Sequence, residues 1–286
     1  MRQYVIILVL VFILLIVGCA SNVETPTQTN GTGTEHPVIL KSDNRQPEQL
    51  ELDVWDANDI QEVKLSRSMG FGTVNEAQFG VFSEQANVDI FLDAIQTATR
   101  INGILDIVRP HYDVTFQAED KVQSIHLWLN IETDGGMYTY VSDTGTGYTL
   151  TEESASELKR LIRDIRYSSE QAEQNGDVVN IHGNYLNLDR WDSFLIHVQQ
   201  GIRDQVQVTS YTIEGDPIFY NLNYDGQSVE YSFDNTMDAY GGSQRVSTFC
   251  ESVESVITEK GTEYSLVGCN GNKARTFGLL IPPQNE

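Results

Sequence analysis

Two cysteines near the C-terminal end restrict how that part of the chain can fold. Cys250 and Cys269 flank two runs of residues that favour strands, 251–257 and 262–268, and four turn residues join the runs. If the runs pair as an antiparallel hairpin, the register that closes the four-residue turn also places Cys250 opposite Cys269. Facing residues of an antiparallel pair lie within disulfide reach. The sequence therefore predicts a hairpin closed by a Cys250–Cys269 disulfide.

Two other uses of this pair are weaker. Neither cysteine has a histidine neighbour, so a zinc site is disfavoured. No cationic side chain stands directly beside either residue to activate a thiolate. We therefore expect these cysteines to be structural, and we expect no metal and no cofactor.

The N-terminal segment has the features of an export signal. Arg2 precedes an apolar run, Val5 to Gly18, and the chain becomes polar directly after Cys19. The run is shorter than the roughly 20 residues that a membrane-spanning helix needs, although a retained helix and an ordinary cleaved signal remain alternatives. The sequence around Cys19 resembles a bacterial lipoprotein signal. This resemblance implies removal of residues 1–18 and lipidation of Cys19, whose acyl chains would anchor the protein on the extracytoplasmic face of the cell membrane.

The composition argues against a nucleic-acid partner. The 286 residues include 41 acidic and 18 basic side chains, a formal net charge of −23. A surface this acidic repels phosphate backbones and favours solubility, although it could attract cations or a basic partner. An exported location would also permit the two remaining cysteines to pair.

Changes in composition divide the chain into segments. Residues 19–49 are rich in Thr, Asn, Gly and Pro, which is typical of a flexible tether. Ordered patterns begin near residue 50, and a polar stretch at 168–177 interrupts them. We predict two small α+β domains, 50–170 and 177–286, each an antiparallel sheet with one or two packed helices.

Helical spacing predicts three helices. One is opened by Asn87, a second spans Glu152–Arg166 with Thr151 as its N-cap, and a third spans Leu188–Gln200 and ends at Gly201. Asp225-Gly226 is typical of a type I′ hairpin turn. Besides the runs in the disulfide hairpin, the predicted strands are 62–66, 78–82, 112–117, 122–131, 137–141, 148–150, 205–213, 218–224 and 228–233.

Two groups of side chains are candidates for ligand contact. Alternation along the 122–131 strand places His126 and Trp128 on the face opposite the apolar one. Tyr220 and Tyr231 share an aromatic face of the hairpin that contains Asp225-Gly226. Either face could contact a ligand, but the first is more often covered by the same domain and the second is more often packed core.

The sequence contains no motif for catalysis or metal binding. It lacks Gly-x-Ser-x-Gly and His-Glu-x-x-His, and we interpret His182 and His197 as structural. The run Asp234–Asp238 offers oxygen ligands for calcium but lacks the glycine and late glutamate of an EF-hand loop, so turn formation is favoured. We predict no catalytic residues.

Two segments resemble known families. Residues 60–166, through Tyr112-Asp113-Val114 and the run 126–130, resemble the YhfM-like domain of Gram-positive lipoproteins. Residues 177–286, through the runs 177–180, 211–218 and 224–226 and the cysteine pair, resemble a domain-of-unknown-function family of exported proteins. Neither resemblance implies an activity. The sequence favours a non-catalytic binding protein whose partner is an envelope protein or peptide, and an extracytoplasmic hydrolase using acidic residues is the alternative.

Overall fold

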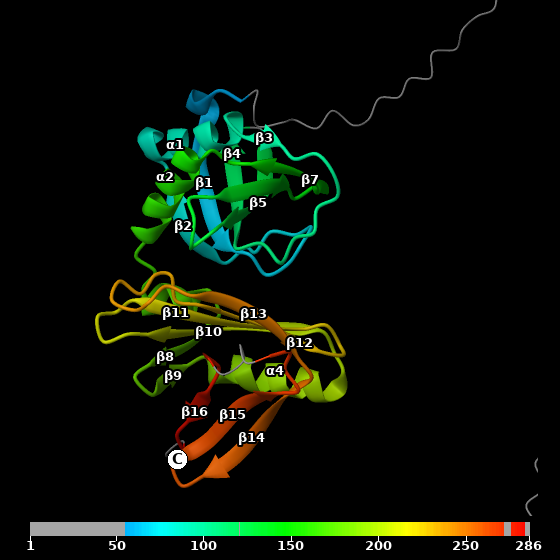
Figure 1. Ribbon diagram of the computed structural model, residues 1–286. Coiled ribbons are helices and arrows are strands. Elements are labelled where there is room, and N and C mark those ends of the chain that lie inside the picture. Colours follow the sequence, from blue (N-terminus) through cyan, green and yellow to red (C-terminus); the bar gives the residue numbers. More distant parts are fainter. Residues whose placement is uncertain (1–54, 120, 272–275, 284–286) are drawn as a thin grey trace, which may run out of the picture. The chain divides into compact units, whose positions relative to one another are not determined.

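The computed structural model describes residues 55–119, 121–271 and 276–283 (Figure 1). The predicted signal (1–18), the tether (19–49) and Cys19 lie outside the described residues. The described residues belong to one unit, Gln49–Glu286. None of the helices in this part of the chain is long and apolar enough to cross a lipid bilayer.

The first half of the described chain forms a seven-stranded sheet in which every neighbouring pair of strands is antiparallel. The strand order is β2-β1-β4-β5-β6-β7-β3. A short 3-10 helix, η2 (Ala57–Asp59), precedes it. The strands are β1 (Ile60–Arg67), β2 (Gln78–Phe82), β3 (Thr99–Arg100), β4 (Tyr112–Ala118), β5 (Val122–Leu129), β6 (Gly136–Tyr140) and β7 (Asp143–Thr149).

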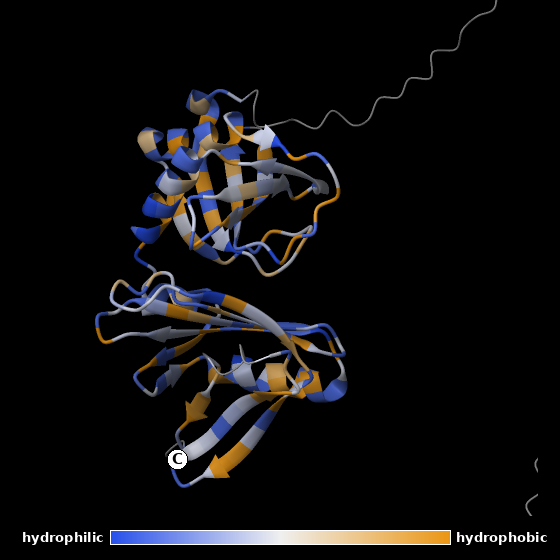
Figure 2. Cartoon of the chain, in the orientation of Figure 1, coloured by the Kyte–Doolittle hydropathy of each residue, from blue (hydrophilic) through white to orange (hydrophobic). Residues whose placement is uncertain are grey.

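Two amphipathic helices, α1 (Gln85–Gln96) and α2 (Glu152–Arg163), pack on this sheet. The Thr151 hydroxyl accepts a hydrogen bond from the Ser154 backbone N–H at 3.1 Å, so the predicted N-cap is confirmed. α1 begins two residues before Asn87 and has no side-chain cap. Figure 2 shows hydrophobic and hydrophilic residues alternating along these helices and strands, which is why one side of each element enters the core.

The second half forms a six-stranded sheet of order β13-β12-β11-β10-β8-β9. β8 and β10 are parallel, whereas the sequence predicted only antiparallel pairing; the connection between them contains β9 and a helix, long enough to return the chain in the same direction. The strands are β8 (Val178–Ile181), β9 (Asn184–Leu186), β10 (Asp204–Tyr211), β11 (Pro217–Tyr224), β12 (Val229–Asp234) and β13 (Arg245–Cys250).

The predicted helix Leu188–Gln200 is present as α4 and ends at Gly201, whose φ of 70° forms the left-handed cap. α4 lies between the six-stranded sheet and a separate three-stranded sheet (Figure 1). That sheet contains β14 (Ser252–Thr258), β15 (Gly261–Val267) and β16 (Leu279–Ile281). The Trp191 ring of α4 lies 5.2 Å from the Tyr264 ring of β15, so α4 joins the two sheets in one core. The α+β class is confirmed.

The polar stretch at 168–177 contains a helix that the sequence did not predict. α3 (Ser169–Gln174) is capped by the Ser168 hydroxyl, which accepts a hydrogen bond from the Gln171 N–H at 3.2 Å. Ala172 is its one buried residue. A six-residue helix with a single small apolar side chain gives no periodic signal, which explains why it was missed.

The type I′ prediction at Asp225-Gly226 is wrong. Gly226 has a φ of 99°, but Asp225 does not have the positive φ that this turn requires at both central residues. Instead, one carboxylate oxygen of Asp225 accepts the backbone N–H groups of Gln227 and Ser228 at 2.8 Å each, which stabilises a four-residue loop. The left-handed pair occurs at His182 (53°) and Gly183 (92°), between β8 and β9.

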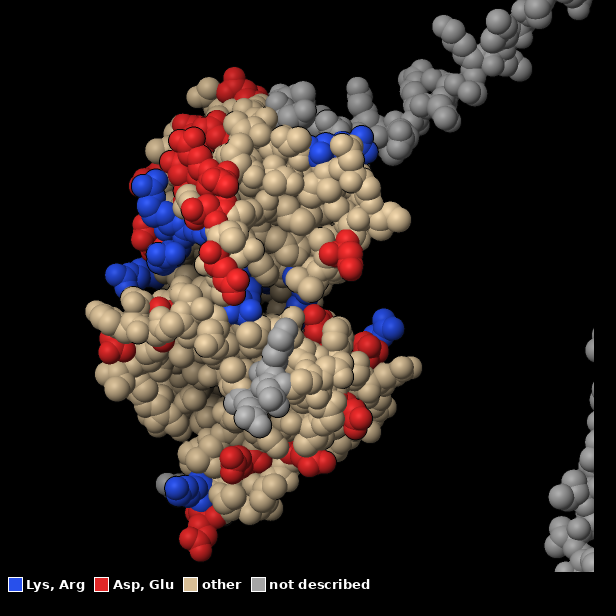
Figure 3. Space-filling model, in the orientation of Figure 1, with Lys and Arg blue, Asp and Glu red and all other residues tan. Residues whose placement is uncertain are grey.

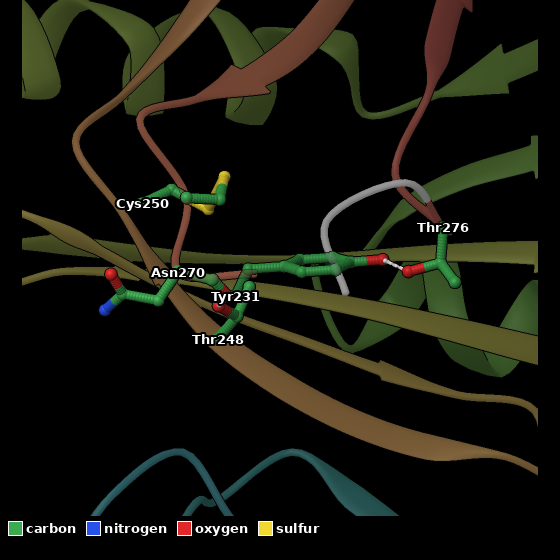
Figure 4. Close-up of a disulfide and its surroundings, with 6 residues drawn as sticks. Tyr231, Thr248, Cys250, Asn270 and Thr276 are labelled. Atoms are coloured by element: carbon green, nitrogen blue, oxygen red, sulfur yellow. Dashed lines mark hydrogen bonds between the residues drawn. A yellow bond between two sulfur atoms is a disulfide. The ribbon is translucent and has the colours of Figure 1, made fainter. Parts of the chain in front are cut away.

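Cys250 and Cys269 form a disulfide (Figure 4). The predicted register is present, because β14 and β15 pair with Ile257 opposite Thr262. Backbone hydrogen bonds continue past the end of that ladder, from Glu251 N–H to the Val267 carbonyl at 2.9 Å. The disulfide therefore joins the end of β13 to the segment that leaves β15.

Candidate ligand-binding site

His126 is fully buried and does not reach a surface from which it could contact a ligand. Its Nε2 accepts the backbone N–H of Gly72 at 3.0 Å, so Nδ1 carries the proton and donates to Asp113 at 2.8 Å. The Phe71 ring covers it at 5.9 Å. As the alternative interpretation predicted, a loop of the same half covers this face, and His126 is corrected from a ligand contact to a core residue.

Trp128 lies on the same face, but its ring lines a cavity. The indole N–H donates to the carbonyl of Val108 at 2.9 Å, and the Phe71 ring lies 6.0 Å away. The indole orientation is therefore fixed, while one part of its surface faces open space. Of the four candidate ligand contacts, only Trp128 lines this cavity.

Tyr220 and Tyr231 belong to the core between the six-stranded sheet and α4. Both contact the Phe277 ring, at 6.3 and 5.6 Å, and Tyr231 has no exposed surface. The Tyr231 hydroxyl and the Thr276 hydroxyl are 2.7 Å apart (Figure 4). Both residues therefore belong to the packed core, as the alternative interpretation in the sequence analysis predicted. Neither is placed to contact a ligand.

The cavity has a volume of about 710 Å³ and lies between the seven-stranded sheet and the six-stranded sheet. One wall, from the loop before β4 and from β5 and its continuation, is mainly apolar. Facing it, the second wall consists mainly of polar residues from β11, β12 and β13. The apolar wall includes Ile101, Val108, Trp128, Leu129, Ile131 and Met137, and the polar wall includes Asn221, Glu230, Ser232, Asp234, Arg245 and Ser247.

The polar wall results from the alternation of β12. Val229, Tyr231 and Phe233 point to the α4 core, so Glu230, Ser232 and Asp234 point the other way. In β11 the same alternation turns Asn221 and Asn223 toward Met69, at the end of β1. β12 thus has an apolar face in the α4 core and a polar face toward the cavity.

Asp234 is the centre of this wall. Its Oδ2 accepts from Arg67 Nη1 at 3.1 Å and from Arg245 Nε at 3.0 Å. Burial alone would raise the pKa of this carboxyl, but the two guanidinium charges and the hydrogen bonds from Thr236 hold the pKa well below its usual range. Because both oxygens are occupied by protein donors, the calcium interpretation of Asp234–Asp238 is not supported, and turn formation is.

Arg109 is a cavity arginine whose guanidinium group is incompletely hydrogen-bonded. Its Nη2 donates to the Ser232 hydroxyl at 2.8 Å, and its Nε lies 3.7 Å from a Glu230 carboxylate oxygen. The side chain is only 9% exposed, and Nη1 is buried with no acceptor among the described residues. Burial lowers the pKa of Arg109, because a guanidinium is less stable away from water.

His111 is a neutral donor in the cavity wall. Its Nδ1 accepts from the Leu129 N–H at 3.0 Å and from Arg245 Nη1 at 2.9 Å, so its proton is on Nε2. Burial and the Arg245 charge lower the pKa of His111 to about 3. The ring is therefore uncharged at neutral pH.

No sequence pattern indicates Arg67, Arg109, His111 or Arg245 as site residues. A local signal did exist for the carboxylates, because the alternation that predicts the Tyr231 face also predicts a polar face with Glu230 and Asp234. No such signal links the arginines to it, since Arg67 is 167 residues from Asp234. Among the residues that the structure describes, no group of three or more His, Cys, Asp or Glu side chains is placed to hold a metal ion.

The fold and the cavity define an α+β protein with one polar and one apolar wall around a site between two sheets. Its two halves match two family models in the predicted order. Residues 71–168 match the YhfM protein family, and residues 175–265 match a family described as a domain of unknown function, DUF4362. No curated protein and no solved structure matches the chain.

Proposed function

We propose that this protein is a non-catalytic binding protein, held on the extracytoplasmic face of the cell membrane by a lipid on Cys19, and that its ligand occupies the cavity between the two sheets. The cavity is the observation that carries the proposal. Its volume of about 710 Å³ lies within the range typical of small-molecule sites. Apolar walls with a few fixed polar groups are the usual composition of such sites.

Rigid support of the lining residues favours binding. Arg245 is held by Asp234, by the Leu129 carbonyl at 3.0 Å and by the Tyr112 hydroxyl at 3.1 Å. Trp128 is fixed through Val108. Because these side chains are ordered without a ligand, little conformational entropy would be lost on binding.

The proposed location rests on the N-terminal sequence. A lipid on Cys19 and a tether over residues 19–49 would keep the folded part near the membrane, where an envelope component or a peptide is available. The disulfide is compatible with an oxidising compartment. Acidic side chains are spread over the face drawn in Figure 3, which disfavours a nucleic-acid partner.

Asp234 also weighs against the hydrolase alternative. A general acid needs a carboxyl with a raised pKa, whereas Arg67 and Arg245 lower the pKa of Asp234. Glu230, another cavity carboxylate, lies beside Arg109. The site thus resembles a charge-balanced wall more than a pair of catalytic carboxylates.

Cavity occupancy can be tested with N-phenyl-1-naphthylamine, an uncharged dye whose fluorescence rises in apolar surroundings. Ser247 of β13 lies opposite Ser232 of β12 and lines the cavity, so Ser247→Trp should place an indole in the space and strongly weaken dye binding. Ser265→Trp, on exposed β15, is the matched control and should bind like the unmodified protein. Equal binding by both variants, or no binding by the unmodified protein, would contradict the proposal.

The anchor is tested separately. Full-length protein expressed in a bacterium that processes lipoproteins should fractionate with membranes and begin at a lipid-modified Cys19 by mass spectrometry. Cys19→Ser should release it or leave residues 1–18 attached. An unmodified Cys19 in the cytosol would contradict the proposed location without affecting the cavity.

A further inference from the structure

The unpartnered hydrogen-bonding groups of the cavity indicate what its ligand must supply. Two guanidinium nitrogens of lining residues, Arg67 Nε and Arg109 Nη1, are buried without an acceptor among the described residues. Buried donors without partners are rare, because each loses the hydrogen bond that water would have formed. Both unpartnered groups are hydrogen-bond donors, so a ligand in this cavity would have to supply hydrogen-bond acceptors.

Charged side chains of both signs line the cavity. Three guanidinium groups, from Arg67, Arg109 and Arg245, line the cavity with three carboxylates, from Glu132, Glu230 and Asp234. His111 adds no charge, because Arg245 and the Leu129 N–H occupy its Nδ1. The formal charges of the lining residues therefore balance, and it is the unpartnered donors that indicate what the ligand must supply.

Of the three arginines, Arg109 has the longest ion pair. Arg67 and Arg245 share Asp234, and the Arg67 guanidinium also stacks on the Phe219 ring at 3.8 Å. The contact between Arg109 and Glu230 is longer, at 3.7 Å, and leaves Nη1 free of any acceptor in the described residues. An anionic group beside Arg109 and Ser232 would supply the acceptor that Nη1 lacks.

The opposite wall determines the rest of the ligand. Val108, Trp128, Ile131 and Met137 present apolar surface to the cavity, and Val108 is 65% exposed. An apolar body against these residues would be removed from water, with the anionic group directed to the polar wall.

We propose that the ligand is a small amphiphile with a single anionic group, a carboxylate or sulfonate, that pairs with Arg109 while its apolar body packs on Trp128. This inference rests on the proposed binding function and specifies the chemical class of the ligand.

Two dyes that differ only by one sulfonate group test this inference. 8-Anilinonaphthalene-1-sulfonate is N-phenyl-1-naphthylamine with a sulfonate group added, so the pair isolates the anion. At physiological ionic strength, Arg109→Gln should weaken binding of the sulfonate dye by roughly tenfold or more, as expected for a lost charge-assisted hydrogen bond. It should change binding of the neutral dye less than about twofold, which also shows that the variant is folded. Arg160→Gln, at an α2 side chain that is 70% exposed, makes the same change in net charge and should affect neither dye.

A second variant does not disturb Arg109. Ser247→Asp adds a carboxylate to the polar wall and should weaken the sulfonate dye alone, whereas Ser265→Asp on exposed β15 should not. The anionic class of the ligand would be contradicted if Arg109→Gln weakened binding of both dyes equally. It would also be contradicted if neither Arg109→Gln nor Ser247→Asp changed binding of the sulfonate dye. If the unmodified protein bound the neutral dye normally in that case, the proposed function would survive. If it bound neither dye, both proposals would fail.

Discussion

Arg67 of β1 donates to Asp234 of β12 at 3.1 Å, and this buried ion pair joins the seven-stranded sheet to the six-stranded sheet. Both side chains are less than one-tenth exposed. Arg245 shares the same carboxylate oxygen. One carboxylate therefore pairs with two buried guanidinium groups, and its loss would remove the ion-pair partner of both.

Asp234→Asn should destabilise the protein by about 3–5 kcal/mol, the usual effect of removing one partner from a buried ion pair. Urea unfolding measures the change in the free energy of unfolding. Asp192→Asn, at an exposed position of α4, is the matched control and should remain within about 0.5 kcal/mol of the unmodified protein. A loss below about 1 kcal/mol in Asp234→Asn would mean that the pair does not hold the two sheets together.

Acid should reproduce part of this loss. Because Arg67 and Arg245 hold the pKa of Asp234 below its usual range, its contribution is complete above about pH 5 and is lost progressively as the pH falls further. Asp234→Asn should lack this component of acid unfolding.

His111 should remain neutral through the physiological range. Its pKa is lowered to about 3, so between pH 6.5 and pH 3 the unfolded chain binds a proton that the folded protein does not. Stability should therefore fall as the pH decreases through this window, and His111→Gln should make the slope shallower. Long-range ¹H–¹⁵N spectra should show the Nε2–H tautomer down to pH 4.5. A titration midpoint between pH 6 and 7 would contradict this assignment.

The disulfide should stabilise the C-terminal hairpin. Cys250 and Cys269 are 19 residues apart, for which the loop-entropy model predicts about 3 kcal/mol. Replacing both cysteines by serine should lower the free energy of unfolding by that order, and reduction of the unmodified protein should have the same effect. Dithiothreitol should not change the double variant further. Unchanged stability on reduction would show that the register alone holds the hairpin.

Local signals predicted much of the fold. The register at Cys250 and Cys269, the end of α4 at Gly201 and the aromatic face of β12 each depend on residues close in sequence, so a short pattern contains the information. Short elements such as α3 were missed because one buried alanine, Ala172, makes no pattern.

The candidate site could be predicted only in part. Trp128 was recognised from strand alternation, but Arg109 is in a loop with no periodic signal. Its contact with Ser232, which is 123 residues away in the sequence, forms only because the two sheets pack together. Long-range packing of this kind is not encoded in spacing, so the arginines of the cavity could not be placed from the sequence.

The three tryptophans of the chain allow the most direct test of the cavity as the binding site. Trp128 lines it, whereas Trp191 is enclosed in the α4 core and Trp55 contacts α1 through Gln96. In protein labelled with ¹⁵N-tryptophan and titrated with N-phenyl-1-naphthylamine, the indole N–H signal of Trp128 should shift in a saturable manner while the other two stay fixed. A shift confined to Trp55 or Trp191, or no shift at saturating dye, would contradict a ligand site between the two sheets.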